Sequence, residues 1–314
     1  MIIEYNLFQR NAIAKTRSDW MIMEPIAVLQ STAEEESNMK YEGIIDISIK
    51  EYHNCPGISR SAILEMKKSA YHYWHKYVNP MAIIDKEETQ ALIFGNAFHT
   101  FCLEPNFFNL RYQFMPKIDR RTKEGKEQYN KILASAEGKE LLPEAIQAQI
   151  SGMYKSLMSN DLAKDYIKNP SNLYEQSLFW RHEATGLLCK ARPDIIQENI
   201  LIDLKTATNA QEHCFKNDLY KHGYHIQAAM QCEAYTAITG KKVESFIFIV
   251  VEKDAPYATA IYFLDEDAIQ IGLNEFNRLM GKVKKCRDTN IWPSYEPKII
   301  SLPNYVNYID EEEL

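Results

Sequence analysis

The sequence lacks any run of about 18 consecutive apolar residues, so we expect no membrane-spanning helix. Its N-terminal segment MIIEYNLFQR contains acidic, amide and basic side chains, and we therefore expect no signal peptide. No C-x-x-C pair is present, because the six cysteines are scattered over positions Cys55, Cys102, Cys189, Cys214, Cys232 and Cys286. This scatter is typical of free thiols in a reducing cytosol, and it disfavours an iron–sulfur cluster or a zinc ribbon. We expect a cytoplasmic protein.

An excess of positive charge is also absent, since the formal net charge is −7 at pH 7. This charge weakens a nucleic-acid-binding hypothesis without excluding it, because basic side chains can gather in one groove. The 314 residues are 46% hydrophobic and 25% charged, enough for a large core without disulfides. We find no internal repeat, and we divide the chain into an extension over 1–40, expected to be poorly ordered, a main domain over 41–305 and an acidic tail over 306–314.

The pattern of apolar residues predicts helices and strands in alternating groups. The predicted helices span 59–78, with Ser59 as N-cap, and 88–103, 143–168, 209–221, 224–239 and 267–286. The predicted strands span 174–183, 187–196 and 200–205, which form a meander, and then 243–252 and 257–264. This order indicates an α/β or α+β sandwich with a central mixed sheet flanked by helices. The basic segment 116–130 is either an arm that touches a DNA backbone or a solvated loop.

Two short motifs carry the most chemistry: Ala191-Arg192-Pro193-Asp194 and Asp203-Leu204-Lys205. Asp203 and Lys205 point to the same face of their strand, and an antiparallel neighbour can bring Asp194 beside them. Two carboxylates and an ammonium on one face suit a divalent metal, a phosphate and a water nucleophile. The alternative is a surface hairpin with a salt bridge. The apolar residues before Asp203 favour burial, and a buried carboxylate is costly unless it is paired or bound to a metal.

Four further residues have a functional and an ordinary interpretation. His99, in an apolar helix, is either a metal ligand or a core or surface histidine. Glu175 either adds a carboxylate to the cluster or is a solvated strand end. Lys190 and Arg192 share the parity of Asp194 on their strand, so they either contact phosphate or lie at an exposed edge.

One predicted helix carries a polar face. Gln227 and Gln231 lie about one turn apart, and Tyr224 and Tyr235 flank them. These amides and phenols could hydrogen-bond a phosphate or a nucleophilic water near the carboxylates. Ordinary polarity of a helix surface explains the same pattern.

The motifs, taken in order, resemble those of the PD-(D/E)xK nuclease superfamily. The nearest likeness is the exonuclease VIII (RecE) group of phage and prophage exonucleases, with a more distant likeness to lambda exonuclease and the RecB nuclease domain. The resemblance covers roughly 50–300. It rests on these segments: P-G-I-S-R-S at 56–61, A-L-I-F-G-N-A-F-H at 91–99, L-E-P at 103–105, Glu175, R-P-D at 192–194, D-L-K-T at 203–206 and Y-H-I-Q at 224–227. The usual Q-x-x-x-Y is displaced, because Gln227 reaches Gln231, and Gln231 reaches Tyr235.

The resemblance implies a restriction-endonuclease-like core over 41–305 and a Mg²⁺-dependent 5′→3′ exonuclease that acts on linear double-stranded DNA in phage-type recombination. Mn²⁺ is expected to substitute. Asp194, Asp203, the carbonyl of Leu204 and His99 are the implied metal ligands, and Lys205 is implied to orient water. Glu175 and Gln227 complete the expected catalytic set. Expected DNA contacts come from Lys190, Arg192, Tyr224, Gln231 and Tyr235. Relatives form ring-shaped trimers or tetramers and work beside a single-strand annealing protein.

Three alternatives stay open at this stage. The first is a structure-specific or restriction-like endonuclease on the same core, which would cut closed circular DNA. The second is a DNA-binding or assembly protein that keeps the core without catalysis, although the intact Asp194, Asp203 and Lys205 disfavour it. The third is a relative with an iron–sulfur cluster, which the scattered cysteines disfavour.

Overall fold

A mixed five-stranded sheet lies at the centre of the computed structural model, which describes residues 41–82 and 89–302. Its strand order is β10 (Thr259–Leu264), β9 (Ser245–Glu252), β8 (Ile200–Ala207), β7 (Ile195–Gln197) and β4 (Leu173–Tyr174). Strands β8 and β9 are parallel and the other pairs are antiparallel. The mixed sheet predicted from the sequence is confirmed. The expected extension over 1–40 and the acidic tail over 306–314 lie outside the described residues.

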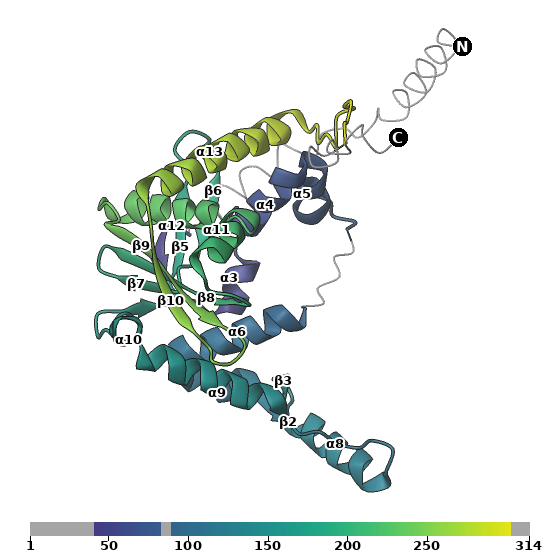
Figure 1. Ribbon diagram of the computed structural model, residues 1–314. Helices are drawn as coiled ribbons and strands as arrows, with labels where there is room; N and C mark the ends of the chain where they lie inside the picture. The colour runs from purple at the N-terminus through teal and green to yellow at the C-terminus, as the bar shows by residue number, and fades with distance from the viewer. Residues whose placement is uncertain (1–40, 83–88, 303–314) are drawn as a thin grey trace, which may run out of the picture. The chain divides into compact units, whose positions relative to one another are not determined.

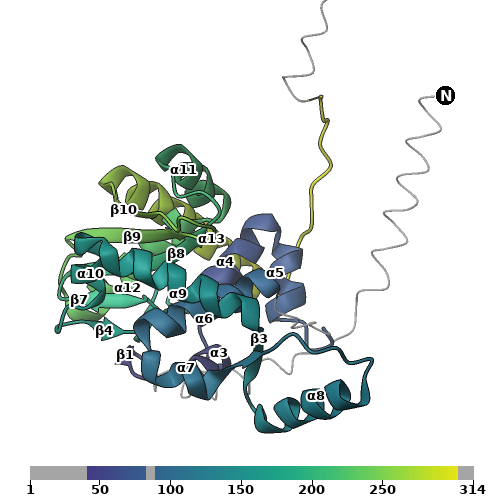
Figure 2. The same cartoon turned by 60° about the horizontal axis from the view of Figure 1, so that its bottom comes forward.

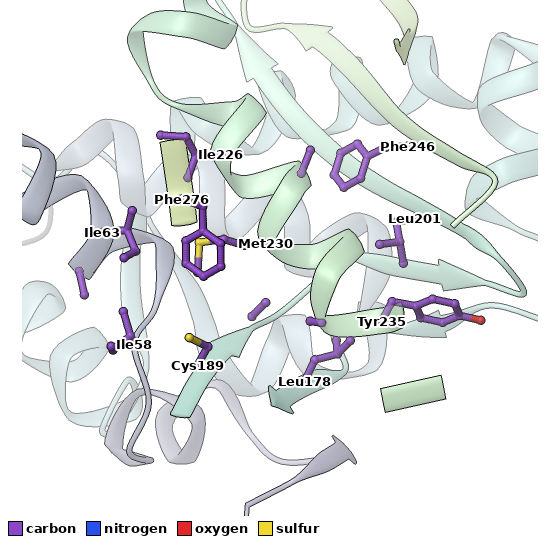
Figure 3. Packing of buried hydrophobic residues seen from close by; sticks show 14 of the residues in the cluster. Ile58, Ile63, Leu178, Cys189, Leu201, Ile226, Met230, Tyr235, Phe246 and Phe276 are labelled. Atoms are coloured by element: carbon purple, nitrogen blue, oxygen red, sulfur yellow. The ribbon is translucent and has the colours of Figure 1, made fainter. Parts of the chain in front are cut away.

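Both faces of this sheet are buried, which explains why β9 is apolar along its length. Phe246, Phe248 and Val250 point to a core formed with α12 (Tyr224–Thr239) and α13 (Glu266–Thr289). The intervening side chains of β9 point to a second core with α6 (Gln90–Leu103) and α9 (Glu144–Ser159). Figure 1 shows these helix pairs on opposite sides of the sheet. Figure 3 shows the first core, where Ile226 and Met230 of α12 gather with Phe276 of α13 and Ile63.

The hairpin that leads into the sheet is bent. The single meander expected from the sequence is therefore wrong, because its strands are divided between two sheets. The predicted strand 174–183 is divided into β4 and β5 (Ser177–Arg181), and 187–196 into β6 (Leu188–Ala191) and β7. Strand β5 pairs with both β6 and β1 (Gly43–Ile45) in a separate three-stranded sheet. Glu175 has a φ of 52°, and Pro193, next to the residue opposite it, has no N–H to donate. Both ladders therefore stop at the bend.

Two predicted helices are each two helices in the structure. Segment 59–78 forms α4 (Arg60–Lys68) and α5 (Ala70–Tyr77), separated by an extended Ser69 whose side chain caps α5. Ser59 caps α4 as predicted, accepting from the N–H of Ala62. Segment 143–168 forms α9 and α10 (Asp161–Ile167), and the side chain of Asn160 caps the second. Such polar side chains compete with the helix backbone for its amides, which ends one helix and begins the next.

Several short elements have no counterpart in the prediction: α3 (Ile49–Asn54), α7 (Pro105–Arg111), and the parallel pair β2 (Tyr112–Met115) and β3 (Glu140–Pro143). Much of the basic segment 116–130 belongs to a helix, α8 (Lys123–Ser135), whose only buried residue is Gly125. Figures 1 and 2 both show α8 away from the central sheet. The remaining helix is α11 (Glu212–Lys221). Among the described residues, no helix is both long and apolar enough to cross a membrane.

Candidate active site

The bend in the hairpin brings Asp194 next to strand β8. Ile195 pairs with Ile202, so Asp194 lies beside Asp203 on the neighbouring strand. Oδ2 of Asp194 accepts a hydrogen bond of 2.7 Å from the backbone N–H of Leu204. The two carboxylates are therefore held together by the strand pairing itself, as the antiparallel arrangement predicted.

Two further ligand groups reach Asp194 from other elements. Nδ1 of His99, on α6, lies 3.4 Å from Oδ2 of Asp194. The N–H of Glu175 donates to the carbonyl of Asp194 at 2.9 Å, which fixes Glu175 at the bend. One ligand atom from each of His99, Glu175 and Asp194 lies within 4.8 Å of the other two. The structure therefore places Glu175 in the cluster, and it also places His99 there.

Asp203 and Lys205 form the other half of the site, on the side of β8 that faces α12. Asp203 is fully buried, and its carboxylate makes an ion pair with Lys205. The other carboxylate oxygen accepts from the side-chain amide of Gln227. The ammonium of Lys205 also lies 4.8 Å from the ring centroid of Tyr224, a distance at which a cation–π attraction acts.

Burial and mutual repulsion perturb the carboxyl groups strongly. Burial, together with the charge of Asp194, raises the pKa of Glu175 to about 7. Burial and the charge of Asp203 raise the pKa of Asp194 well above its usual value. Burial lowers the pKa of His99, and the charge of Lys205 adds to this effect. Carboxyls that resist ionisation when crowded, next to a neutral imidazole, are the chemistry expected of a site that takes a cation.

The ligand types fit a divalent metal ion. Carboxylate oxygens suit Mg²⁺ or Mn²⁺, and an imidazole is a common additional ligand for a transition metal. His99 also hydrogen-bonds to the backbone carbonyl of Leu204, the carbonyl that the resemblance implies as a ligand. Asp203 lies beside this cluster, and the residues within 4.8 Å of one another are His99, Glu175 and Asp194.

Lys190 and Arg192 have structural contacts rather than the expected open approach to phosphate. Lys190 is 7% exposed, and its ammonium donates to the carbonyls of Tyr52 at 2.9 Å and of Cys55 at 2.6 Å. Arg192 donates from Nε to Oε2 of Glu175 at 2.9 Å and also to the carbonyl of Ile47. Arg192 therefore orients Glu175, and Lys190 fastens the end of α3. The expected DNA contact of either residue gains no support.

The polar residues of α12 have two kinds of partner, carboxylates and backbone carbonyls. Tyr224 and Gln227 lie at the carboxylates, as predicted. One amide hydrogen of Gln231 is directed to the carbonyl of Arg192 at 3.4 Å, and the hydroxyl of Tyr235 donates to the carbonyl of Glu198 at 2.6 Å. Gln231 and Tyr235 therefore bind the backbone of the bent hairpin, and the structure gives no support to their expected contact with DNA.

Sequence reasoning missed Arg60, the first residue of α4. Its guanidinium lies 5.2 Å from the ring centroid of Tyr224, the ring that also meets Lys205. The only signal in the sequence is its position between two serines in the segment 56–61.

The mixed sheet and the acidic bend define a PDDEXK-like domain. The chain belongs to the family described as "PDDEXK-like domain of unknown function (DUF3799)", whose model matches residues 59–301. No curated protein matches the sequence. Family membership supports a nuclease, as the resemblance implies.

One solved structure shows the same fold, and another has a weaker likeness. The "Putative exonuclease" from Eubacterium rectale is 14% identical, and the match covers 85% of this chain and 94% of that chain with a TM-score of 0.55. An alkaline exonuclease from Laribacter hongkongensis, also 14% identical, matches over 60% of this chain and 100% of that chain with a TM-score of 0.21.

Proposed function

We propose that this chain is a Mg²⁺-dependent exonuclease that degrades linear double-stranded DNA in the 5′→3′ direction, with Mn²⁺ able to replace Mg²⁺. The observation that carries the proposal is the gathering of Asp194, Asp203 and Lys205 at one bend, with Glu175 and His99 beside them. A salt-bridged surface hairpin would not bury Asp203 completely. The combination of acidic ligands and one ammonium is suited to phosphodiester hydrolysis.

His99, Glu175 and Asp194, together with Asp203, would hold the metal ion. When bound, a divalent cation polarises the scissile phosphate and stabilises the negative charge of the leaving oxygen. The carboxyl groups would ionise more readily beside a bound cation, because their raised pKa values reflect burial and mutual charge.

The side chain of Lys205 supplies hydrogen-bond donors. Burial alone would lower its pKa, but the charges of Asp203 and Asp194 outweigh burial and raise the pKa. The ammonium therefore keeps its proton at neutral pH, so Lys205 orients the attacking water and stabilises charge that develops on the phosphate. Gln227 holds Asp203 in place, and Arg192 holds Glu175.

The resemblance extends the proposal to partners and setting. We propose a cytoplasmic nuclease domain over 41–305 that takes DNA ends as substrate in phage-type recombination. The proposed assembly is a ring-shaped trimer or tetramer, and the proposed protein partner is a single-strand annealing protein.

Digestion of labelled DNA tests the proposal. Linear duplex labelled at the 5′ end should lose its label early as mononucleotides with Mg²⁺ or Mn²⁺, whereas 3′-labelled duplex should lose it late. Substrates with 5′-phosphate and 5′-hydroxyl ends should be compared in parallel. Cutting of closed circular duplex would instead identify an endonuclease. Binding of DNA without release of nucleotide under any of these conditions would identify a non-catalytic DNA-binding protein.

A further inference from the structure

Two cationic side chains of helix α4 lie against tyrosine rings of α11 and α12. The guanidinium of Arg60 lies 5.2 Å from the ring centroid of Tyr224, and the ammonium of Lys67 lies 5.2 Å from that of Tyr220. The charge of Lys67 is matched by Glu275, whose carboxylate is 2.9 Å away. Arg60 has no such partner, because it forms no ion pair with a carboxylate among the residues that the structure describes.

The hydrogen bonds of Arg60 are also incomplete. One terminal nitrogen donates to the backbone carbonyl of His222, at the end of α11. The Nε–H is buried and has no partner among the described residues. A buried donor without an acceptor costs about 1–3 kcal/mol, so a native protein usually keeps one for a ligand or for water.

A second cation lies beside Arg60. Arg60 and Lys205 both lie against the ring of Tyr224, at 5.2 Å and 4.8 Å from its centroid. The carboxylate that acts most strongly on the pKa of Arg60 is that of Asp203, and Asp203 is already bound by Lys205 and Gln227. Lys205 and Gln227 occupy the two oxygens of this carboxylate, so the charge of Arg60 has no direct anionic partner there, next to the lysine of the proposed site. An anion can neutralise this charge.

We propose that Arg60, with Lys205 and Tyr224, forms a phosphate-binding subsite that holds the DNA backbone beside the proposed metal site. The inference deepens the proposed nuclease function and rests on it. A guanidinium presents donors in a planar fork that matches two oxygens of a phosphate, and Arg60 has donors left for this purpose. Arg60 is thus a substrate-binding residue: it holds the phosphate while Lys205 acts at the bond that breaks.

A purely structural role for Arg60 makes a different prediction. In that case the side chain only ties α4 to the start of α12, through the carbonyl of His222 and the ring of Tyr224. Its removal would then lower the melting temperature and leave DNA binding by the folded protein unchanged. Phosphate contacts have a separate signature, because each cation that neutralises a phosphate contributes about 0.9 to the slope of log K against log salt concentration for duplex DNA.

The test compares Arg60→Gln, Arg60→Lys and the matched control Lys67→Gln with the wild type. The dissociation constant of each protein for a linear duplex is measured by fluorescence anisotropy with Ca²⁺ over a salt series, and a thermal melt gives the folded fraction. We expect Arg60→Gln to bind about 10-fold more weakly and to lose about one unit of salt slope, with Arg60→Lys keeping most of the slope. Lys67→Gln should bind like the wild type.

Kinetics with Mg²⁺ complete the test and separate the two proposals. For Arg60→Gln we expect KM to rise more than kcat falls, as for a residue that mainly binds substrate. Dissociation constants and salt slopes equal to those of the wild type would overturn the subsite, even if the nuclease is active. A wild type that releases no nucleotide, yet binds DNA in an Arg60-dependent way, would overturn the nuclease and leave the subsite standing. Should Arg60→Gln fail to fold, Arg60→Lys tests the fork instead: it keeps the charge and the salt slope but loses the paired contact, so a dissociation constant equal to that of the wild type would overturn the subsite.

Discussion

Lys190 lies on β6 and Lys205 on β8, in different sheets, and the two lysines differ sharply in their surroundings. Each ammonium lies against a tyrosine ring, 4.9 Å from the centroid of Tyr52 for Lys190 and 4.8 Å from that of Tyr224 for Lys205. The ammonium of Lys190 otherwise meets only backbone carbonyls, and burial lowers its pKa. Lys205 meets the carboxylate of Asp203, and the nearby carboxylates raise its pKa in spite of burial.

The difference teaches which polar side chains are available for chemistry. We call Lys190, Gln231 and Tyr235 the backbone-bound group, because their donors end on main-chain carbonyls. We call Lys205, Gln227 and Arg192 the carboxylate-bound group, because each donates to the carboxylate of Asp203 or Glu175, although Arg192 also donates to the carbonyl of Ile47. Removing a member of the first group should cost stability, whereas removing a member of the second should cost activity. The predictions below test this division.

The largest effect is expected at the carboxylate that the second group surrounds. Asp203→Asn keeps the shape of the side chain and removes its charge, so Lys205 and the proposed metal lose a common partner. We expect nucleotide release per folded molecule to fall by at least about 10³-fold, and the melting temperature in EDTA to fall as well, because the ammonium of Lys205 loses its partner. Unchanged activity would remove Asp203 from the mechanism. The measurement is release of label from linear duplex with Mg²⁺, together with a thermal melt.

Substitution of the two lysines tests the comparison directly. Lys205→Met should reduce kcat by about 10²–10³-fold, the range for removing a donor that stabilises developing charge, and leave the fold intact. Lys190→Met leaves the carbonyls at the end of α3 without their donor, so it should lower the free energy of unfolding by about 1–3 kcal/mol and keep kcat per folded molecule. Kinetics and urea unfolding of both variants check this, and an inactive but stable Lys190→Met would contradict the division.

The pH dependence of the metal-free protein should be dominated by the same bend. The pKa of Glu175 is raised from 4.5 to about 7, so the folded state binds this proton more tightly than the unfolded state. Its contribution is therefore fully present below pH 4.5 and is lost as pH rises through about 7, which amounts to roughly 3 kcal/mol. The raised pKa of Asp194 acts with the same sign.

Urea unfolding in EDTA at a series of pH values measures this loss. Glu175→Gln, which carries no titrating carboxyl, is the matched control, and the difference between the two curves isolates Glu175. Mg²⁺ should stabilise the wild type more at pH 8 than at pH 5, because binding requires ionised carboxylates. Parallel curves for the wild type and Glu175→Gln would show that Glu175 titrates normally.

Much of the site could be predicted because strand geometry is regular. The alternation of side chains placed Asp203 and Lys205 together, and antiparallel pairing placed Asp194 beside them. The register between Ile195 and Ile202 fulfils this arrangement. The central sheet and its flanking helices likewise follow from apolar periodicity alone.

The rest depends on contacts between segments far apart in the chain. The bend in 187–196 comes from the backbone at Glu175 and Pro193, which no periodicity reveals. The carbonyls that bind Lys190 belong to α3, a six-residue helix too short to show a pattern. The alternation of side chains could therefore assign Lys190 and Arg192 to the same strand face as Asp194. It could not show which groups their side chains would bind.

The smallest effect is expected at the far end of α12, where the backbone-bound group is most distant from the carboxylates. Tyr235→Phe removes one hydroxyl, and the carbonyl of Glu198 loses a hydrogen bond of 2.6 Å. We expect a loss of about 1 kcal/mol in the free energy of unfolding, with kcat, KM and the salt dependence of DNA binding all unchanged. Gln227→Leu, on the part of α12 next to the site, should show the reverse pattern. Activity should fall while the free energy of unfolding changes little, because Asp203 loses its amide partner. A rise in KM for Tyr235→Phe would mean that this tyrosine contacts DNA after all, and that donors ending on backbone do not mark a structural role.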